Sequence, residues 1–356
     1  MYDAELTKGW LLNSGIQNTG KDAGSINAWY DCDKNAYPCI YPETTGYAIT
    51  SFLFINKQKP EAILLERAKL AAEWLIRRNA LHENNNNEKP ESHMEYAFDN
   101  GMILAGLMNI YDTTKEKRYI KEAEKVAVTL LRLQKPNGEF YAFYNKNTKE
   151  LVDSEEKWST QSGSYHAKLS IGLLKIHEAT GHEKFRKAAE NACDAALKMQ
   201  QPDGRFVSCK KKGFTHIHPH CYSAEGLLYA SNILKKPEYA LAARKAAEWA
   251  LKNLREDGSI SCIYNNGGFT DCERSDTLAQ ILRLAKLLGI KHQKEEQLKE
   301  RLLAFMEMKG RQNGGFFYCM EGQKMAKHLN SWCSMFAMQA LSINEKNKKE
   351  SLRLLI

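Results

Sequence analysis

This sequence of 356 residues lacks several features that mark membrane or secreted proteins. It has no run of roughly 18 or more apolar residues, so no segment is expected to cross a membrane. The start, Met1-Tyr-Asp-Ala-Glu-Leu6, lacks the basic and then apolar stretches of a secretory signal. The nine cysteines are an odd number, and no two form a Cys-x-x-Cys pair. These absences favour reduced thiols in a cytoplasmic protein without a membrane partner.

Charge of one sign is also not concentrated anywhere. The 51 basic and 43 acidic residues give a net charge of +8, and the densest basic runs, 210–212 and 346–349, are typical of solvated surface. No basic segment with interleaved aromatic residues is present, so nucleic acid is not an expected partner. With 43% hydrophobic and 26% charged residues, the composition is that of an ordinary globular protein.

What the sequence does contain is a repeat. Mostly apolar helices rich in small residues are predicted to begin near Glu43, Asp99, Tyr165, Cys221, Asp276 and Trp332. These starts recur about every 56 residues, which indicates a repeat architecture. Amphipathic helices are predicted to follow the apolar ones, at 61–78, 117–133, 183–199, 238–254 and 294–309. Glycine turns such as Asn137-Gly138 and Asp203-Gly204 close the units, because Asn, Asp and Gly tolerate positive φ.

The repeat predicts the fold class. Six hairpins with apolar inner helices and amphipathic outer helices close naturally into an all-α (α/α)6 toroid, and an open helical solenoid is the alternative. We expect one domain over 1–356, with 1–40 forming an N-terminal helix and loop that pack on the barrel. The segment 84–87 is predicted to be a polar loop.

All six inner-helix starts share one phase of the repeat, so a closed ring would gather their side chains at one end. We predict Glu43, Asp99, His220 and Asp276 as catalytic residues. The predicted substrate-binding residues are Tyr41, Tyr47, His166, His218, Tyr222, Glu225, Glu273, Arg274, His328 and Trp332. The histidines at 216, 218 and 220 are expected in a loop that Pro219 stiffens. Asp99, Ser275 and Thr44 could instead be simple N-caps.

Aromatic rings mixed with carboxylates and histidines suit a sugar, and glycosidic cleavage needs two acids in different environments. Hydrolysis of an oligosaccharide or polysaccharide, which could be acidic, is therefore the expected reaction. The sequence leaves open which two of the acids act. Uronyl epimerisation or polysaccharide elimination is an alternative that would use His220 with Arg274. A glycan-binding toroid without catalysis is another.

Five motifs carry a resemblance to a known family: Tyr41-Pro-Glu-Thr-Thr-Gly-Tyr47, Phe98-Asp-Asn-Gly101, Tyr165-His-Ala167, His218-Pro-His-Cys-Tyr222 and Asn330-Ser-Trp332. They resemble a bacterial family of six-hairpin toroids that is similar to six-hairpin glycosidases and accompanies polysaccharide genes. The match spans about 41–343. Where that family shows Asp-Thr-Gly-Gln, this chain has Asp99-Asn-Gly-Met102, so the role of that position is open. The resemblance implies a carbohydrate-active fold without specifying the reaction.

Two other toroid chemistries compete. The turn segments Gln134–Phe140 and Gln201–Phe206 resemble the repeats of terpene cyclases and protein prenyltransferases, which are also α/α toroids. The acidic Asp-x-Asp-Asp motif is not present, which disfavours that chemistry. No cofactor is expected. The alternative is a zinc ion near the inner-helix starts, with ligands drawn from Cys221, Cys272, Cys319, Cys333 and either His218 or His220. The sequence makes no prediction of oligomeric state.

Overall fold

The computed structural model describes residues 3–81, 93–265 and 267–356, so the loop predicted at 84–87 lies outside the described residues. Contacts divide the chain into two compact units. Unit 1 comprises Met1–Pro90, Leu254–Ser261 and Asp271–Ile356, and unit 2 comprises Glu91–Asn253 and Cys262–Thr270. The expectation of a single domain over 1–356 stays a prediction.

Unit 2 contains three consecutive helical hairpins. The helices are α4 (Ala97–Thr114), α5 (Lys117–Leu133), α6 (Ser170–Thr180), α7 (Glu183–Leu197), α8 (Ile217–Leu234) and α9 (Pro237–Lys252). The 3-10 helices are η2 (Trp158–Thr160) and η3 (Ser164–Leu169), and η3 runs directly into α6. The even-numbered helices pack on one another and are buried almost all round, whereas α5, α7 and α9 are buried on one face only. This is the predicted alternation of inner and outer helices.

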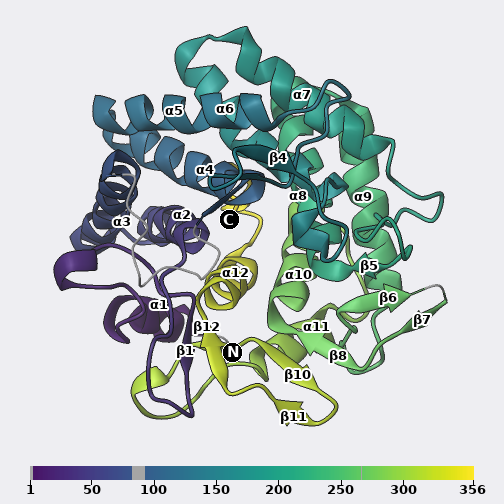
Figure 1. Ribbon diagram of the computed structural model, residues 1–356. Helices are drawn as coiled ribbons and strands as arrows, with labels where there is room; N and C mark the ends of the chain where they lie inside the picture. Colours follow the sequence, from purple (N-terminus) through teal and green to yellow (C-terminus); the bar gives the residue numbers. More distant parts are fainter. Residues whose placement is uncertain (1–2, 82–92, 266) are drawn as a thin grey trace. The chain divides into compact units, whose positions relative to one another are not determined.

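Unit 1 holds the remaining hairpins. Its helices are α1 (Ala4–Asn13), α2 (Pro42–Gln58), α3 (Ala62–Leu81), α10 (Ser275–Leu288), α11 (Glu295–Leu303), α12 (Ser331–Ser342) and α13 (Lys348–Arg353), with 3-10 helices η1 (Gly20–Asp22) and η4 (Gly310–Gln312). The inner helices α10 and α12 lie side by side, and α12 also contacts α2 (Figure 1). Inner α2 pairs with α3, and α10 pairs with α11.

The outer partner of α12 comes from the other end of the chain. Helix α1 packs against α12, and Trp10 Nε1 donates a hydrogen bond of 2.8 Å to Gln312 Oε1. The turn after α11 also reaches α1, because a Cβ on Gly314 would lie 2.2 Å from the carbonyl oxygen of Leu6. Residues 4–13 therefore complete the sixth hairpin, and the N-terminal helix is an integral outer helix.

Short strands, which the helical periodicity did not predict, lead into four of the inner helices. The three-stranded antiparallel sheets of unit 1 are β1 (Trp29–Asp31), β12 (His328–Asn330) and β9 (Phe316–Phe317), and β11 (Lys324–Met325), β10 (Cys319–Glu321) and β8 (Cys272–Arg274). Those of unit 2 are β2 (Met94–Tyr96), β3 (Phe143–Asn145) and β4 (Glu150–Val152), and β5 (Thr215–His216), β6 (Ile263–Asn265) and β7 (Gly268–Phe269). Strands of two or three residues are too short to give a readable alternation.

Glutamine side chains fasten the glycine turns to the next outer helix. Gln134 Nε2 donates to the carbonyl oxygen of Gly138 in its own turn, at 3.1 Å, and to that of Ala188 on α7, at 2.9 Å. Gln200 makes the same pair of bonds to its own turn and to α9, at 2.9 and 2.8 Å. In the second turn the repeated glutamine is therefore Gln200 and not Gln201. These bonds give the cyclase-like turns a structural role.

The predicted histidine loop is wrong in part. Helix α8 begins at Ile217, so His218 and His220 lie in its first turn and only His216 precedes it. Pro219 fits there because a first-turn residue needs no intrahelical partner for its amide. In the described part of the chain, every helix is too short or too polar to cross a membrane.

Candidate functional site

In unit 1, Arg274 is the centre of a polar cluster at the start of α10. It is the last residue of β8 and the N-cap of α10. Its Nε donates to Asp276 Oδ1 at 3.0 Å, and its Nη2 donates to Asp276 Oδ2. Asp276 also accepts a hydrogen bond of 3.0 Å from Trp332 Nε1 at the start of α12. Burial alone would lower the pKa of Arg274, but the Asp276 carboxylate raises that pKa well above its usual value.

Half-buried aromatic rings surround this cluster. The Arg274 guanidinium carbon lies 4.6 Å from the centre of the Tyr318 ring. Tyr318 and Tyr41 both pack edge-on against Trp332, with centroid distances of 6.0 and 6.2 Å. His328 lies 5.0 Å from Tyr318, and burial lowers its pKa. The predicted residues Tyr41, Arg274, His328 and Trp332 therefore form one cluster, which Tyr318 joins.

Two other predicted substrate-binding residues of unit 1 make contacts with an outer helix and with the core. Glu273 is almost fully buried and forms a bidentate ion pair with Arg301 on outer helix α11, with distances of 2.6 to 3.1 Å. It precedes Arg274 in a strand, so the two side chains point to opposite faces. Tyr47 is 3% exposed and packs edge-on against Phe336 of α12, in the core. Glu43 lies in the first turn of α2 and is 7% exposed.

Unit 2 contains a second cluster, built on aromatic rings. Phe98, in the first turn of α4, packs on Tyr222 of α8 at 4.6 Å and on Tyr165 of η3 at 5.5 Å. His218 lies 4.3 Å from the Tyr222 ring and 5.8 Å from Trp158. Phe98, Tyr165, Tyr222 and His218 are buried, whereas Trp158 is half-buried.

Asp99 follows Phe98 and is half-buried. It differs in this respect from Asp276, which is completely buried in its ion pair. A carboxylate that keeps access to solvent is suited to proton transfer with a bound sugar.

A buried ion pair lies next to this cluster, and the sequence analysis predicted only one of its two members, Glu225. Lys168 Nζ is 2.8 Å from Glu225 Oε2, and both side chains are fully buried. Lys168 Nζ also lies 4.2 Å from the centre of the Tyr222 ring. Glu225, predicted as substrate-binding, is thus neutralised inside the unit. A lysine in an otherwise apolar helix, about one repeat before a buried glutamate, was the available signal.

His220 does not have the surroundings of a catalytic base. Its Nδ1 accepts from the Phe206 amide at 3.1 Å, and its Nε2 lies 3.0 Å from the Ala246 carbonyl oxygen of α9. These partners require the proton on Nε2. Burial lowers the pKa of His220 to about 4. With both nitrogens bonded to backbone, His220 ties α8 to the preceding turn and to α9.

His166 occupies the corresponding place on η3. It is 2% exposed, and its ring lies 5.7 Å from Phe140, as that of His220 lies 5.9 Å from Phe206. Neither ring nitrogen has a hydrogen-bond partner among the described residues. Burial lowers the pKa of His166 to about 3, so the ring is neutral near pH 7.

The zinc alternative finds no ligand set in the described residues, where no three His, Cys, Asp or Glu side chains are placed to hold a metal ion. Cys221 and Cys333 are completely buried. Burial raises the pKa of Cys333 well above its usual value, which disfavours the thiolate that zinc needs.

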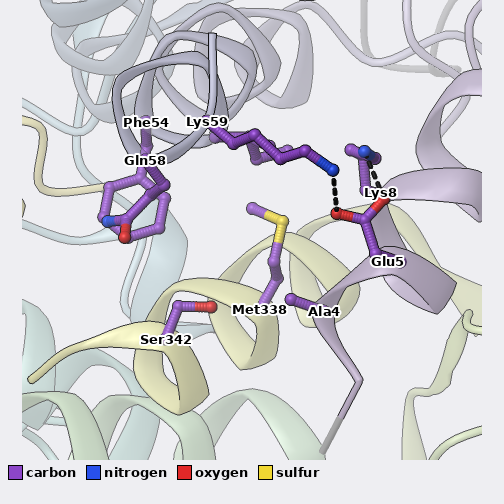
Figure 2. A pocket seen from close by; sticks show the side chains of 9 residues that line it. Ala4, Glu5, Lys8, Phe54, Gln58, Lys59, Met338 and Ser342 are labelled. Atoms are coloured by element: carbon purple, nitrogen blue, oxygen red, sulfur yellow. Dashed lines mark ion pairs between the residues drawn. The ribbon is translucent and has the colours of Figure 1, made fainter. Parts of the chain in front are cut away.

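A small pocket of about 120 Å³ lies elsewhere in unit 1, at the C-terminal ends of α2 and α12 (Figure 2). Phe54 and Met338 line it, and Glu5 pairs there with Lys8 and, at 3.5 Å, with Lys59. The predicted site residues are not among those that line it.

The chain is similar to one family of known enzymes in sequence and to several solved structures in fold. The catalytic-domain model of the GH127 β-L-arabinofuranosidases matches residues 57–212. The structure of cellobiose 2-epimerase from Bacillus thermoamylovorans has a TM-score of 0.74 at 11% identity, covering 94% of this chain and 98% of that one. Unsaturated glucuronyl hydrolase from Bacillus sp. GL1 has a TM-score of 0.69 at 14% identity, covering 95% and 96%. The fold is the six-hairpin (α/α)6 toroid. The predicted fold class is thereby confirmed.

Two further matches have low sequence identity or cover only part of the relative. The α-1,6-mannanase of Salegentibacter sp., in an inactive variant with two Asp-to-Asn changes, has a TM-score of 0.66 at 10% identity, covering 95% of this chain and 97% of that one. An uncharacterised Caenorhabditis elegans protein is 26% identical over 169 residues, which is 43% of this toroid chain and 23% of the relative. The match thus spans less than a quarter of that relative's length.

Proposed function

We propose that this toroid is a carbohydrate-active enzyme that hydrolyses a glycosidic bond in an oligosaccharide or polysaccharide. The observation that carries the proposal is the half-buried carboxylate of Asp99, which follows Phe98 in the first turn of α4. The same unit holds the aromatic cluster of Phe98, Trp158, Tyr165 and Tyr222. The match to a glycosidase family model and the fold shared with a glucuronyl hydrolase and a mannanase support it.

The contacts narrow the choice of acids. Asp276, Glu225 and Glu273 each form an ion pair with a basic side chain, so their oxygens are engaged within the protein. Asp99 and Glu43 each lie in the first turn of an inner helix, and Asp99 is half-buried. In our proposal Asp99 is the general acid that protonates the leaving oxygen, and Glu43 is the second carboxylate, acting on water or on the sugar.

Epimerisation or elimination would need a base near the sugar, and His220 was the predicted one. Its two backbone hydrogen bonds and low pKa disfavour that role. Hydrolysis is therefore preferred, and the reaction test is designed to distinguish all three.

The test is turnover of a panel of polysaccharide fragments by the wild type, followed by mass, ultraviolet absorbance and NMR. Hydrolysis adds one water, elimination creates a conjugated chromophore, and epimerisation leaves the mass unchanged. We expect Asp99→Asn and Glu43→Gln each to lower kcat by about 10²-fold or more, the scale for removing a general acid or base. Asp203→Asn, in the turn before α8, is the control and should keep wild-type turnover. Near-normal kcat in both test variants would refute the assignment.

A further inference from the structure

The geometry points to Arg274 as the binding site for a sugar carboxylate, which makes a hexuronate-containing saccharide the substrate class. This inference rests on the proposed function and adds to it a specificity-determining residue in unit 1. It requires that the guanidinium be fixed, that part of it be accessible, and that its donors suit a carboxylate better than a hydroxyl group.

The guanidinium is fixed by its contacts on one edge and one face. Asp276 accepts from both Nε and Nη2, and Trp332 Nε1 holds the same carboxylate at 3.0 Å. The ring of Tyr318 lies against the guanidinium at 4.6 Å. Since the plane is already oriented, little side-chain entropy is lost when a ligand binds.

The opposite edge of the guanidinium keeps N–H groups that Asp276 does not use. The side chain of Arg274 is 14% exposed, and apart from the bonds to Asp276 it makes no hydrogen bond within the described part of the chain. The remaining N–H groups are donors only. A carboxylate offers two coplanar acceptors to such an edge, whereas a hydroxyl group also needs an acceptor for its own proton.

The surroundings suit an acidic sugar as well. Trp332, Tyr41 and Tyr318 supply half-buried rings against which a pyranose can pack. The neighbouring Glu273 is neutralised by Arg301, so it does not repel an anion. The first turn of α12 has no acidic residue, which leaves its amide groups favourable to negative charge. Because Asp276 offsets the formal charge of Arg274, selectivity comes from donor geometry more than from net charge.

The experiment uses matched probes: oligosaccharides that end in glucuronate or galacturonate, and the same compounds with the carboxylate reduced to hydroxymethyl. Isothermal titration of the wild type should give a Kd about tenfold or more lower for the acidic member of a pair. In the double variant Arg274→Gln/Asp276→Asn, which removes both charges together, that ratio should fall to about one. Arg274→Lys, which keeps the charge but loses the planar donors, should fall in between.

Arg301→Lys is the matched control, because it alters a bidentate arginine–carboxylate pair on the opposite face of the same strand. It should preserve the wild-type ratio. Equal affinity of the wild type for acidic and reduced probes would overturn the inference and leave the proposed function standing. Retention of the preference in the double variant would also overturn it. If neither probe class binds and no fragment is turned over, the proposed function fails, and the carboxylate site fails with it.

Discussion

His166 and His220 occupy the same place in successive repeats of unit 2, yet among the described residues only His220 has hydrogen-bond partners. Both rings are nearly inaccessible, and each lies beside the phenylalanine that follows a glycine turn. His220 has two backbone partners, whereas neither nitrogen of His166 has a partner among the described residues. The repeat thus preserves the position of a side chain without preserving its interactions. Burial by itself is no sign of function at either position.

The largest expected effect of a single substitution on stability is at the buried ion pair of Lys168 and Glu225. Glu225→Leu should destabilise the protein by about 3–5 kcal/mol, because it leaves the lysine charge buried without its counter-ion. The double variant Lys168→Met/Glu225→Leu should regain most of that loss. Urea unfolding measures both. If Glu225→Leu were as stable as the wild type, the buried lysine would not need its counter-ion.

Lowering the pH should reduce the free energy of unfolding through both histidines, because both rings are buried in the neutral form. Their folded-state pKa values, about 3 for His166 and about 4 for His220, lie below the ordinary value of 6.5. Their stabilising contribution is therefore complete above about pH 6.5 and is lost as the pH falls toward 4. The free energy of unfolding should decrease by roughly 1.4 kcal/mol per pH unit for each histidine in this range.

Urea midpoints between pH 7 and pH 4.5 give this slope. The double variant His166→Leu/His220→Leu provides the reference, because it lacks both titrating rings. An unchanged slope in that variant would assign the acid sensitivity to other groups.

The smallest effect separates the two histidines directly. His220→Leu should cost about 1–3 kcal/mol, because the Phe206 amide and the Ala246 carbonyl lose their partner inside the protein. His166→Leu, a matched change of nearly equal volume, should be neutral or slightly stabilising. It removes two buried ring nitrogens that have no hydrogen-bond partner in the described part of the chain. Equal losses in the two variants would contradict the difference between the sites.

Prediction from sequence was most accurate for regular helices. The expected helix at 117–133 matches α5, Lys117–Leu133, because an amphipathic pattern over 17 residues is unambiguous. The contacts of individual side chains were harder to predict. His220 and Glu273 were expected at the substrate, yet their partners lie on outer helices that are distant in sequence. Lys168 was overlooked for the same reason, since Glu225 is 57 positions away.

The sequence by itself determined the helical hairpins, their recurrence about every 56 residues and the positions of the glycine turns. These features depend on periodicity and backbone preference within short windows. Only the tertiary structure decided which groups meet one repeat apart, such as Asp276 with Trp332, and that α1 completes the hairpin of α12. It also decided which carboxylates are neutralised and which stay accessible. The physical reason is that ion pairing and desolvation depend on neighbours that packing brings together from distant parts of the chain.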